Sequence, residues 1–287
     1  MSQAAYQLFL PKKRETSVIF ASPHSGRDYS ADFLAEIFLD EKEIRSSEDA
    51  FVDQLFAAAP DFGAPLLVAK APRAYVDLNR AADELDPALI EGLRRPPHNP
   101  RIASGLGVIP RVVANGRAIY HGKIPVEVAH DRLSRIWRPY HDRLQSLIDE
   151  NLRDFGQAIL IDCHSMPREA LDQMGHNTGP RPDVVLGDRF GASCGEEIVS
   201  LVEQAFVGLG LRVQRNVPFA GAHIVQTYGR PTRHQHALQI EIDRSLYMDE
   251  AAIEPSAAFA DFVGTLTQAI GQIARIGLLD STRLAAE

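Results

Sequence analysis

The stretch "AILIDCHSM", Ala158 to Met166, decides the fold class of this chain. Four apolar residues lead directly into Asp162, Cys163 and His164, which is the pattern of a buried strand that ends in polar groups. Because side chains alternate along a strand, Asp162 and His164 share one face and Cys163 lies on the other. In open α/β sheets the ligand crevice lies at the carboxyl ends of the strands, where we expect His164. A structural histidine that caps the strand would explain the same pattern.

Outside this stretch, short β-rich runs alternate with amphipathic segments, which is typical of a layered α/β domain. We predict a single layered α/β domain over residues 1–287. The predicted strands are residues 18–22, 65–69, 74–78, 158–162, 184–187, 211–215, 224–227 and 237–242. The predicted helices are residues 31–39, 48–59, 126–155, 192–209 and 252–273.

One irregular stretch, residues 91–110, is rich in Pro, Gly and Arg. Loops of this length within a compact domain are often functional, so we expect either a rim or lid of the site or a surface loop without a role.

The composition excludes some classes of partner. A formal net charge of −8 argues against a protein that binds nucleic acid or anionic membranes. No apolar run approaches the roughly 20 residues that a membrane span needs. The first residues lack the basic-then-apolar order of a signal peptide, and the chain has only 2 cysteines. We therefore expect a cytoplasmic protein that acts on a small molecule; the oligomeric state is not predicted.

A second histidine follows a predicted strand in "VIFASPHSGRDY", residues 18–29. Pro23 ends the apolar run, and His24 lies just beyond it. His24 is a turn residue, the partner of Ser25 in a nucleophilic pair, or a metal ligand. Two histidines at two strand ends meet only if the strands are neighbours. With one carboxylate and an open position, two neutral imidazoles form a catalytic zinc site.

The candidate carboxylates lie in "IRSSEDAFVDQLF", residues 44–56. Ser46-x-x-Asp49 resembles a capping box, so Glu48 and Asp49 are predicted in a first helical turn. Both acids could simply complement the helix dipole, or one could be the third metal ligand. Adjacent helical positions point about 100° apart, so only one would reach the ion, and the spacing does not choose between them.

A glutamate interrupts the apolar run in "HALQIEIDRSLYMDE", residues 236–250. On the predicted strand Glu241 shares a face with Gln239 and Asp243. A buried carboxylate is costly unless it is paired or functional, so we weigh an ion pair with Arg80 or Arg244 against a general base. We favour the base, because perturbed buried carboxylates concentrate at active sites.

An Asn-Arg pair ends the predicted strand in "RAYVDLNRAADELDP", residues 73–87. Arg80 offers a planar, two-pronged contact to a carboxylate. The pattern indicates either a substrate contact or a surface salt bridge.

Five of these segments together resemble the N-formylglutamate amidohydrolase family. They are "SPHSGRDY", "SEDAFVDQL", "DLNR", "IDCHSMP" and "TYGRPTRHQHALQIEIDRSLYMDE", in that order and spanning most of the chain. The resemblance implies a three-layer domain in which a mixed β-sheet is flanked by helices. This phosphorylase/hydrolase-like fold is similar to that of the zinc carboxypeptidases, with one Zn²⁺ per chain. It also implies hydrolysis of N-formyl-L-glutamate to formate and glutamate, a late step in histidine degradation.

The resemblance further implies roles for individual residues. His24 and His164 match the two histidine ligands of the metal. The acid of "SED" matches the third ligand, which we place at Asp49 with Glu48 as the alternative. Glu241 corresponds to the catalytic glutamate.

The resemblance also implies the contacts to the substrate. Asn79 and Arg80 are similar to a pair that binds a substrate carboxylate and polarises the scissile carbonyl. Arg233 and Arg244 are candidates for the side-chain carboxylate, and we favour Arg233 because it lies in a loop rich in Pro and Gly. The chain has "GAHI" where the family pattern has Gly-Gly-Tyr-Ile, which places His223 at the aromatic position. Another acidic N-acyl amino acid is therefore an alternative substrate.

Two rival hypotheses remain from the sequence. The first is a metal-independent amidase that uses Cys163, against which the strand alternation argues. The second is a non-catalytic binding protein for small acidic metabolites. The complete set of His24, Asp49, His164 and Glu241 argues against this second hypothesis.

Overall fold

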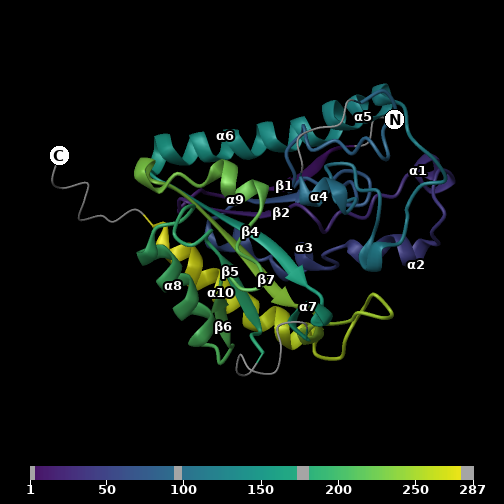
Figure 1. Ribbon diagram of the computed structural model, residues 1–287. Helices are drawn as coiled ribbons and strands as arrows, with labels where there is room; N and C mark the ends of the chain where they lie inside the picture. The colour runs from purple at the N-terminus through teal and green to yellow at the C-terminus, as the bar shows by residue number, and fades with distance from the viewer. Residues whose placement is uncertain (1–3, 94–98, 173–180, 279–287) are drawn as a thin grey trace. The chain divides into compact units, whose positions relative to one another are not determined.

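The computed structural model describes residues 4–93, 99–172 and 181–278 of the chain (Figure 1). The chain groups into two compact units. The first unit comprises Met1–Gln7, Pro23–Ala50 and Val68–Arg143, and the second comprises Leu8–Ser22, Phe51–Leu67 and Leu144–Glu287. Because each unit draws on separated stretches of chain, no single boundary divides them. One domain over residues 1–287 stays a prediction.

A seven-stranded sheet with the order β1-β3-β2-β4-β7-β5-β6 confirms the predicted mixed α/β architecture. Strands β2, β4 and β7 run parallel, and β5 runs antiparallel to β7. The carboxyl ends of β2, β4 and β7 therefore lie at one edge of the sheet. The strands of this sheet are β1 (Tyr6–Phe9), β2 (Val18–Ser22), β3 (Leu66–Ala69), β4 (Ala158–Met166), β5 (Val184–Gly187), β6 (Val213–Arg215) and β7 (Gln235–Asp243). A separate hairpin pairs β8 (Met248–Asp249) with β9 (Glu254–Pro255).

The helices of the first unit are short, whereas the second unit contains both short and longer helices. Those of the first unit are α1 (Ala31–Ala35), α2 (Glu41–Ile44), α4 (Pro100–Ala103) and α5 (Val126–Arg132). Those of the second unit are α3 (Val52–Leu55), α7 (Arg168–Asp172), α8 (Glu196–Val207), α9 (His223–Tyr228) and α10 (Phe259–Ile276). Helix α6 (Arg138–Phe155) continues from α5 through a π-helical turn, as the single predicted helix 126–155 requires.

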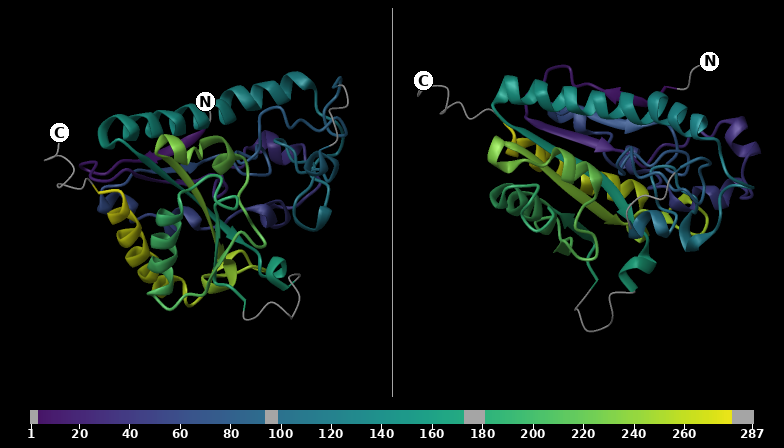
Figure 2. Two further views of the ribbon diagram at one scale, coloured as in Figure 1. Left: turned by 60° about the vertical axis from the view of Figure 1, so that its left-hand side comes forward. Right: turned by 45° about the horizontal axis from the view of Figure 1, so that its top comes forward.

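Helices cover both faces of the sheet within the second unit. On one face, the Gln239 side chain, in register with Asp162, accepts a hydrogen bond from the residue that precedes α9. On the other face, Phe20, in register with Ile161, contacts the Phe56 ring at the end of α3. Helix α10 packs against α3 and runs beside α8 (Figures 1 and 2). The sheet is therefore flanked by helices, as the sequence predicts.

Two predicted strands are wrong. Residues 74–78 form a turn, in which the N–H groups of Tyr75 and Val76 both donate to the carbonyl of Pro72. Residues 224–227 belong to α9, where the N–H of Gly229 donates to the carbonyl of Val225. Both segments are short apolar runs, and in such runs periodicity does not separate strand from helix or turn.

The predicted helix over residues 48–59 is also largely wrong. Only Val52–Leu55 is α-helical. Phe51, just before it, has a φ of 66°, in the left-handed region, so the α-helix does not begin earlier. Glu48 is extended, with φ −65° and ψ 146°, so neither Glu48 nor Asp49 lies in a first helical turn. The stretch 91–110 contains α4, and residues 94–98 within it lie outside the described residues.

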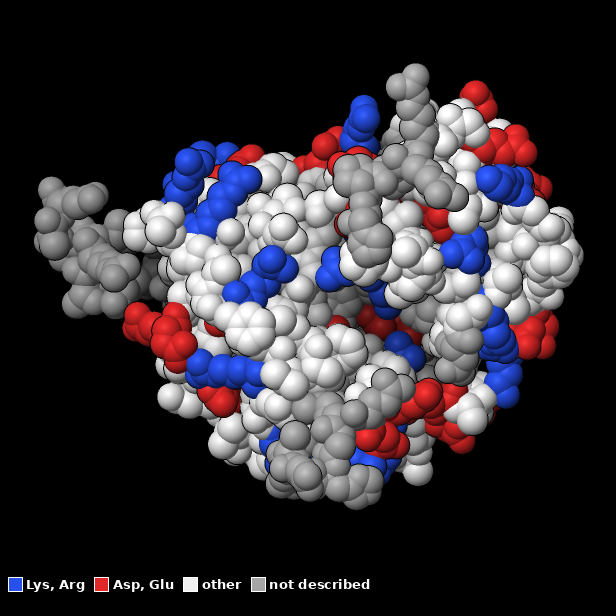
Figure 3. Space-filling model, in the orientation of Figure 1, with Lys and Arg blue, Asp and Glu red and all other residues white. Residues whose placement is uncertain are grey.

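No helix in the described ranges combines the length and the apolar character that crossing a bilayer demands. On the face shown in Figure 3, Lys and Arg side chains lie among Asp and Glu side chains instead of forming one continuous basic area.

Candidate active site

Strands β4 and β7 place four polar residues in two adjacent rows. His164 lies in register with Glu241, and Asp162 lies in register with Gln239. Register partners on neighbouring strands point to the same side of a sheet, and so do residues two apart on one strand. All four side chains therefore share one face near the carboxyl end of β4 and β7. We call His164 and Glu241 the functional row, and Asp162 and Gln239 the supporting row.

Each member of the supporting row contacts the functional residue on its own strand. Asp162 Oδ2 lies 3.1 Å from His164 Nε2. Gln239 Nε2 donates a hydrogen bond of 2.8 Å to Glu241 Oε1. The four residues are buried, with Asp162 fully so and Glu241 at 7% exposure. Buried polar groups need such partners, so the two rows form one interdependent set.

His24 follows β2, where the chain leaves the sheet. Ala21 on β2 is in register with Asp162 on β4, two residues before His164. The turn requires a glycine at position 26, since a Cβ there would lie 2.1 Å from the carbonyl oxygen of Ala71. Pro23 and Gly26 thus direct the chain so that the His24 side chain is buried.

The ring of His24 is held by a carboxylate from far along the chain. Its Nε2 lies 2.7 Å from Asp77 Oδ1, 53 residues away. Arg73 Nε donates to the other carboxylate oxygen of Asp77 at 3.0 Å. Burial by itself would raise the pKa of Asp77, but the neighbouring His24, Arg73 and Arg80 outweigh it and hold the pKa well below its usual range. Asp77 is therefore a stable anion against His24.

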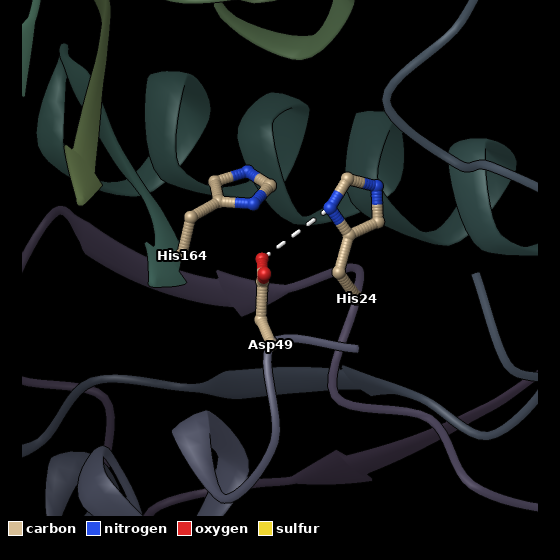
Figure 4. A group of neighbouring side chains, drawn as sticks. All are labelled: His24, Asp49 and His164. Carbon is tan, nitrogen blue, oxygen red and sulfur yellow. Dashed lines mark ion pairs between the residues drawn. The ribbon is translucent and has the colours of Figure 1, made fainter. Parts of the chain in front are cut away.

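Asp49 completes a group of three with the histidines. Its N–H donates to the carbonyl of His24 at 3.0 Å. His24 Nδ1 lies 3.4 Å from Asp49 Oδ2, as the dashed line in Figure 4 marks. The ligand atoms of His24, Asp49 and His164 all lie within 4.8 Å of one another, and all three side chains are buried. Figure 4 shows them turned toward a common point.

The three residues fit a zinc ion. In a tetrahedral site with ligand bonds of about 2.0–2.1 Å, ligand atoms lie about 3.3 Å apart, close to the 3.4 Å between His24 and Asp49. Both histidines direct Nε2 at a carboxylate, Asp77 or Asp162, which leaves Nδ1 on each ring as the ligand atom. Two imidazole nitrogens, one carboxylate and an open position are the donor set of a catalytic zinc site.

Glu48 is engaged elsewhere. Its carboxylate accepts hydrogen bonds from Arg45 Nε at 3.1 Å and from the Tyr29 hydroxyl at 2.6 Å. Burial and the adjacent Glu48 raise the pKa of Tyr29, so its hydroxyl remains a donor. The structure thus brings Asp49, and not Glu48, together with the two histidines.

Asn79 and Arg80 lie in the first unit, next to the carboxylate that holds His24. The N–H of Asn79 donates to Asp77 Oδ1 at 2.8 Å. Arg80 donates to the carbonyls of Leu106 and Asn79 at 3.0 and 2.8 Å and is buried at 7% exposure. Burial lowers the pKa of Arg80, but a guanidinium remains charged at neutral pH. Asp77 therefore links the position of His24 to that of the Asn-Arg pair.

Arg233 is not brought to Glu241. It is exposed and ends the turn before β7, whereas Glu241 lies near the other end of that strand. The strand from Gln235 to Glu241 spans about 20 Å at 3.3 Å per residue. Arg244 is buried at the carboxyl end of β7 and donates to Ser165 Oγ at 3.1 Å. Strand direction thus separates the two arginines that the sequence left as alternatives.

Cys163 does not have the environment of a nucleophile. It is fully buried on the opposite face from His164, and its Sγ contacts the carbonyl of Ile161. Burial and the nearby Asp162 raise the pKa of the Cys163 thiol well above its usual range. Because the thiolate is the reactive form, this environment argues against an amidase that uses Cys163.

The sequence did not predict three contributions to the site. These are the contact of Asp77 with His24 and the supporting roles of Asp162 and Gln239. For the last two a signal existed, since each stands two positions before a functional residue on a strand and so shares its face. For Asp77 the pairing with His24 spans 53 residues and has no local signal.

A buried His-Asp-His group at the carboxyl edge of an α/β sheet offers the donor set of a metal site, and the glutamate beside one histidine suits hydrolytic chemistry. Known proteins of similar sequence carry the names of amide hydrolases. A crystal structure titled N-formylglutamate amidohydrolase, from Ralstonia eutropha JMP134, matches with a TM-score of 0.90 and 36% identity, covering 96% of this chain and 99% of that one. A gene product of Agrobacterium tumefaciens, Atu2144, shares the fold with a TM-score of 0.63 at 16% identity.

Two curated relatives carry the name N-formylglutamate deformylase. The one from Pseudomonas putida is 31% identical over 236 residues, which cover 81% of this chain and 82% of the relative. The one from Pseudomonas aeruginosa is 30% identical over 253 residues, covering 87% and 88%. The family model described as N-formylglutamate amidohydrolase matches residues 16–248. The chain belongs to the N-formylglutamate amidohydrolase family.

Proposed function

We propose that this protein hydrolyses the formyl amide of N-formyl-L-glutamate, or of a related acidic N-acyl amino acid, with one zinc ion per chain. The observation that carries the proposal is the buried group of His24, Asp49 and His164, next to Glu241 on the neighbouring strand. Family membership and the names of the relatives support amide hydrolysis as the reaction.

In this proposal His24, Asp49 and His164 hold the zinc ion. Zinc in such a site polarises a carbonyl and lowers the pKa of water to about 7. Asp77 and Asp162 keep the two imidazoles oriented, with Nδ1 toward the ion.

Glu241 acts as the general base. It accepts a proton from the attacking water as the new carbon–oxygen bond forms at the formyl carbon. It then donates that proton to the amine nitrogen as the carbon–nitrogen bond breaks, so formate and the free amino acid leave. The register of Glu241 with His164 supports this role, because it puts the carboxylate on the same face as one of the residues that would hold the ion.

Arg80 binds a carboxylate of the substrate, with Asn79 beside it. The guanidinium is buried and oriented by two carbonyl groups, Leu106 and Asn79, so little conformational freedom remains to be lost on binding. An oriented substrate converts an encounter in solution into a productive geometry.

The substrate chemistry suggests a wider setting for the reaction. Release of formate and glutamate would make this a late step of histidine degradation. Both cysteines of the chain are free and buried, which supports a reducing, cytoplasmic compartment.

The experiment is a turnover assay on purified protein with a panel of N-formyl and N-acyl amino acids. We expect one zinc per chain, loss of activity on chelation and recovery on addition of zinc. E241Q should retain the zinc but lose about 10²- to 10⁴-fold in kcat, the usual contribution of a general base. C163S, which alters a side chain on the other face, should keep near-normal activity. Full activity in stringently metal-free protein would contradict the proposal.

A further inference from the structure

Gln239 stands between two parts of the second unit. It lies on β7, two residues before Glu241, and is buried at 3% exposure. Its Oε1 accepts a hydrogen bond of 3.2 Å from the N–H of Ala222, and its Nε2 donates the 2.8 Å bond to Glu241 Oε1. One amide thus connects the proposed base to the segment that opens α9.

The chemistry of the partners sets the orientation of this amide. A backbone N–H can only donate, so the atom of Gln239 that faces Ala222 is the oxygen. The NH₂ group must then face Glu241, where a carboxylate oxygen accepts its hydrogen. The same arrangement with the amide reversed would put two donors face to face at Ala222. The bond to Glu241 therefore has a fixed direction.

A glycine on the neighbouring strand lets the α9 segment come this close. Gly187 on β5 is in register with Gln239, and a Cβ at Gly187 would lie 2.7 Å from the nitrogen of Gly221 and 2.8 Å from the carbonyl carbon of Ala220. The N–H of Arg189 also donates to the carbonyl of Ala220 at 2.8 Å. The backbone before α9 is thus held against the sheet, beside Gln239.

We propose that Gln239 is a positioning residue for Glu241. Its hydrogen bond to Oε1 of Glu241 helps to orient the carboxylate that takes the proton from water and returns it to the leaving nitrogen. Without the amide this restraint is lost, and the last torsion of glutamate is broad, so the carboxylate adopts other orientations more often. The inference rests on the proposed role of Glu241 as general base.

The test compares wild type with Q239M, Q239E and the control Q226M, an exposed position on α9. Q239M keeps the length of the side chain but removes both hydrogen bonds. We expect kcat to fall about 10- to 100-fold, as for a small misplacement of a catalytic group, with KM within about twofold and zinc content unchanged. Q226M should match wild type in all three quantities.

Q239E separates positioning of Glu241 from support of the α9 segment. Its carboxylate can still accept from Ala222, but it offers Glu241 an anion in place of a donor. If Gln239 positions Glu241, Q239E loses at least as much kcat as Q239M. If Gln239 only holds the segment before α9, Q239E retains near wild-type kcat, and the inference is overturned.

A double-mutant cycle provides a measurement that does not depend on the absolute loss. In an E241Q background Q239M should cause little further loss, because the two residues act as a unit. Equal losses in both backgrounds would overturn the inference. Wild-type protein that binds zinc but hydrolyses no member of the substrate panel would refute the proposed function instead, so the two failures are distinguishable.

Discussion

The residues that form the candidate site are held in two different ways. His164 and Glu241 lie inside the ladder between β4 and β7, where backbone hydrogen bonds fix their register. His24 lies just beyond β2, and Asp49 lies in the irregular segment before α3, so neither belongs to a strand. There the ring of His24 depends on Asp77, a residue from a separate turn.

The two regions differ in what fixes the positions of their side chains. A strand residue is placed by its backbone, and a partner two positions earlier on the same strand contacts its side chain. A turn residue needs side chains and close backbone approaches from distant parts of the sequence, such as Asp77 and the contact of Gly26 with Ala71. We therefore expect substitutions in the turns to cost more than comparable substitutions in the ladder.

The largest expected effect is that of G26A. A Cβ at position 26 would lie 2.1 Å from the carbonyl oxygen of Ala71, and backbone on both sides must move to admit it. We expect a loss of about 1–3 kcal/mol in the free energy of unfolding, together with weaker zinc binding through His24. Urea denaturation and zinc titration measure the two effects. G122A is the matched control, since nothing lies within 4 Å of a Cβ there. If G26A and G122A had equal stability and equal zinc affinity, the turn at Gly26 would not be unusually sensitive to substitution.

The next effect compares the two carboxylates that orient the histidines. D77N and D162N should each weaken zinc binding about 10- to 100-fold, the usual effect of losing such a partner. D77N should have the larger effect, because Asp77 also contacts Arg73 and Asn79. Competition with a chromophoric chelator measures the zinc affinities. D61N, a substitution of the same type at an exposed position, is the control. A larger effect of D162N would reverse the proposed difference between turn and ladder.

A smaller effect is expected from Y29F. The variant removes the 2.6 Å hydrogen bond to Glu48, whose carboxylate still has Arg45 as a partner. We expect a loss of about 1 kcal/mol in unfolding free energy, typical for one hydrogen bond. Chemical denaturation measures it, with Y6F on β1 as the matched change. If zinc affinity fell as far in Y29F as in D77N, Glu48 would belong to the support of the site.

The smallest effect is expected for R212A, at a strand end distant in sequence from the site. Burial would raise the pKa of Asp183, but hydrogen bonds from Arg212 outweigh it and lower the pKa below its usual value. A lowered pKa contributes stability above the unfolded value of about 3.9, and this contribution is lost as the pH falls through the folded value. The pair is partly exposed, with Arg212 at 54%, so we expect less than about 1 kcal/mol at pH 7.

Denaturation of wild type and R212A as a function of pH tests this expectation. The difference between the two proteins should be present at neutral pH and shrink below about pH 4. If the difference in unfolding free energy grew as the pH fell, the Asp183–Arg212 pair would stabilise the protein at acid pH and not at neutral pH.

The ladder was the most predictable part of the molecule. The apolar run before Asp162 and His164 and the alternation around Glu241 identify two buried strands and the faces of their polar residues. That β4 and β7 are neighbours in the sheet is a long-range property. No local pattern in the sequence predicts it. Pairing in register, His164 with Glu241, could be recognised only from the folded chain.

The turns were predicted poorly for a physical reason. The segment around Asp49 reads as a helix start, yet Phe51 takes a left-handed conformation that a local pattern does not favour. Contacts from Arg45 and Tyr29 to Glu48 accompany this geometry, and tertiary contacts routinely override local propensity. The sequence therefore predicted which residue types form the site, but not the contacts that hold them in place.

The ladder between β4 and β7 also limits how this chain can change over generations. Deletion of one residue early in β7 would turn Glu241 to the opposite face of the sheet, and deletion of two would put Asp243, one methylene shorter, beside His164. Single replacements of the apolar residues of β7 do not change the register of Glu241 with His164. Within this strand, descendants of the chain should thus show varied residues but a constant length.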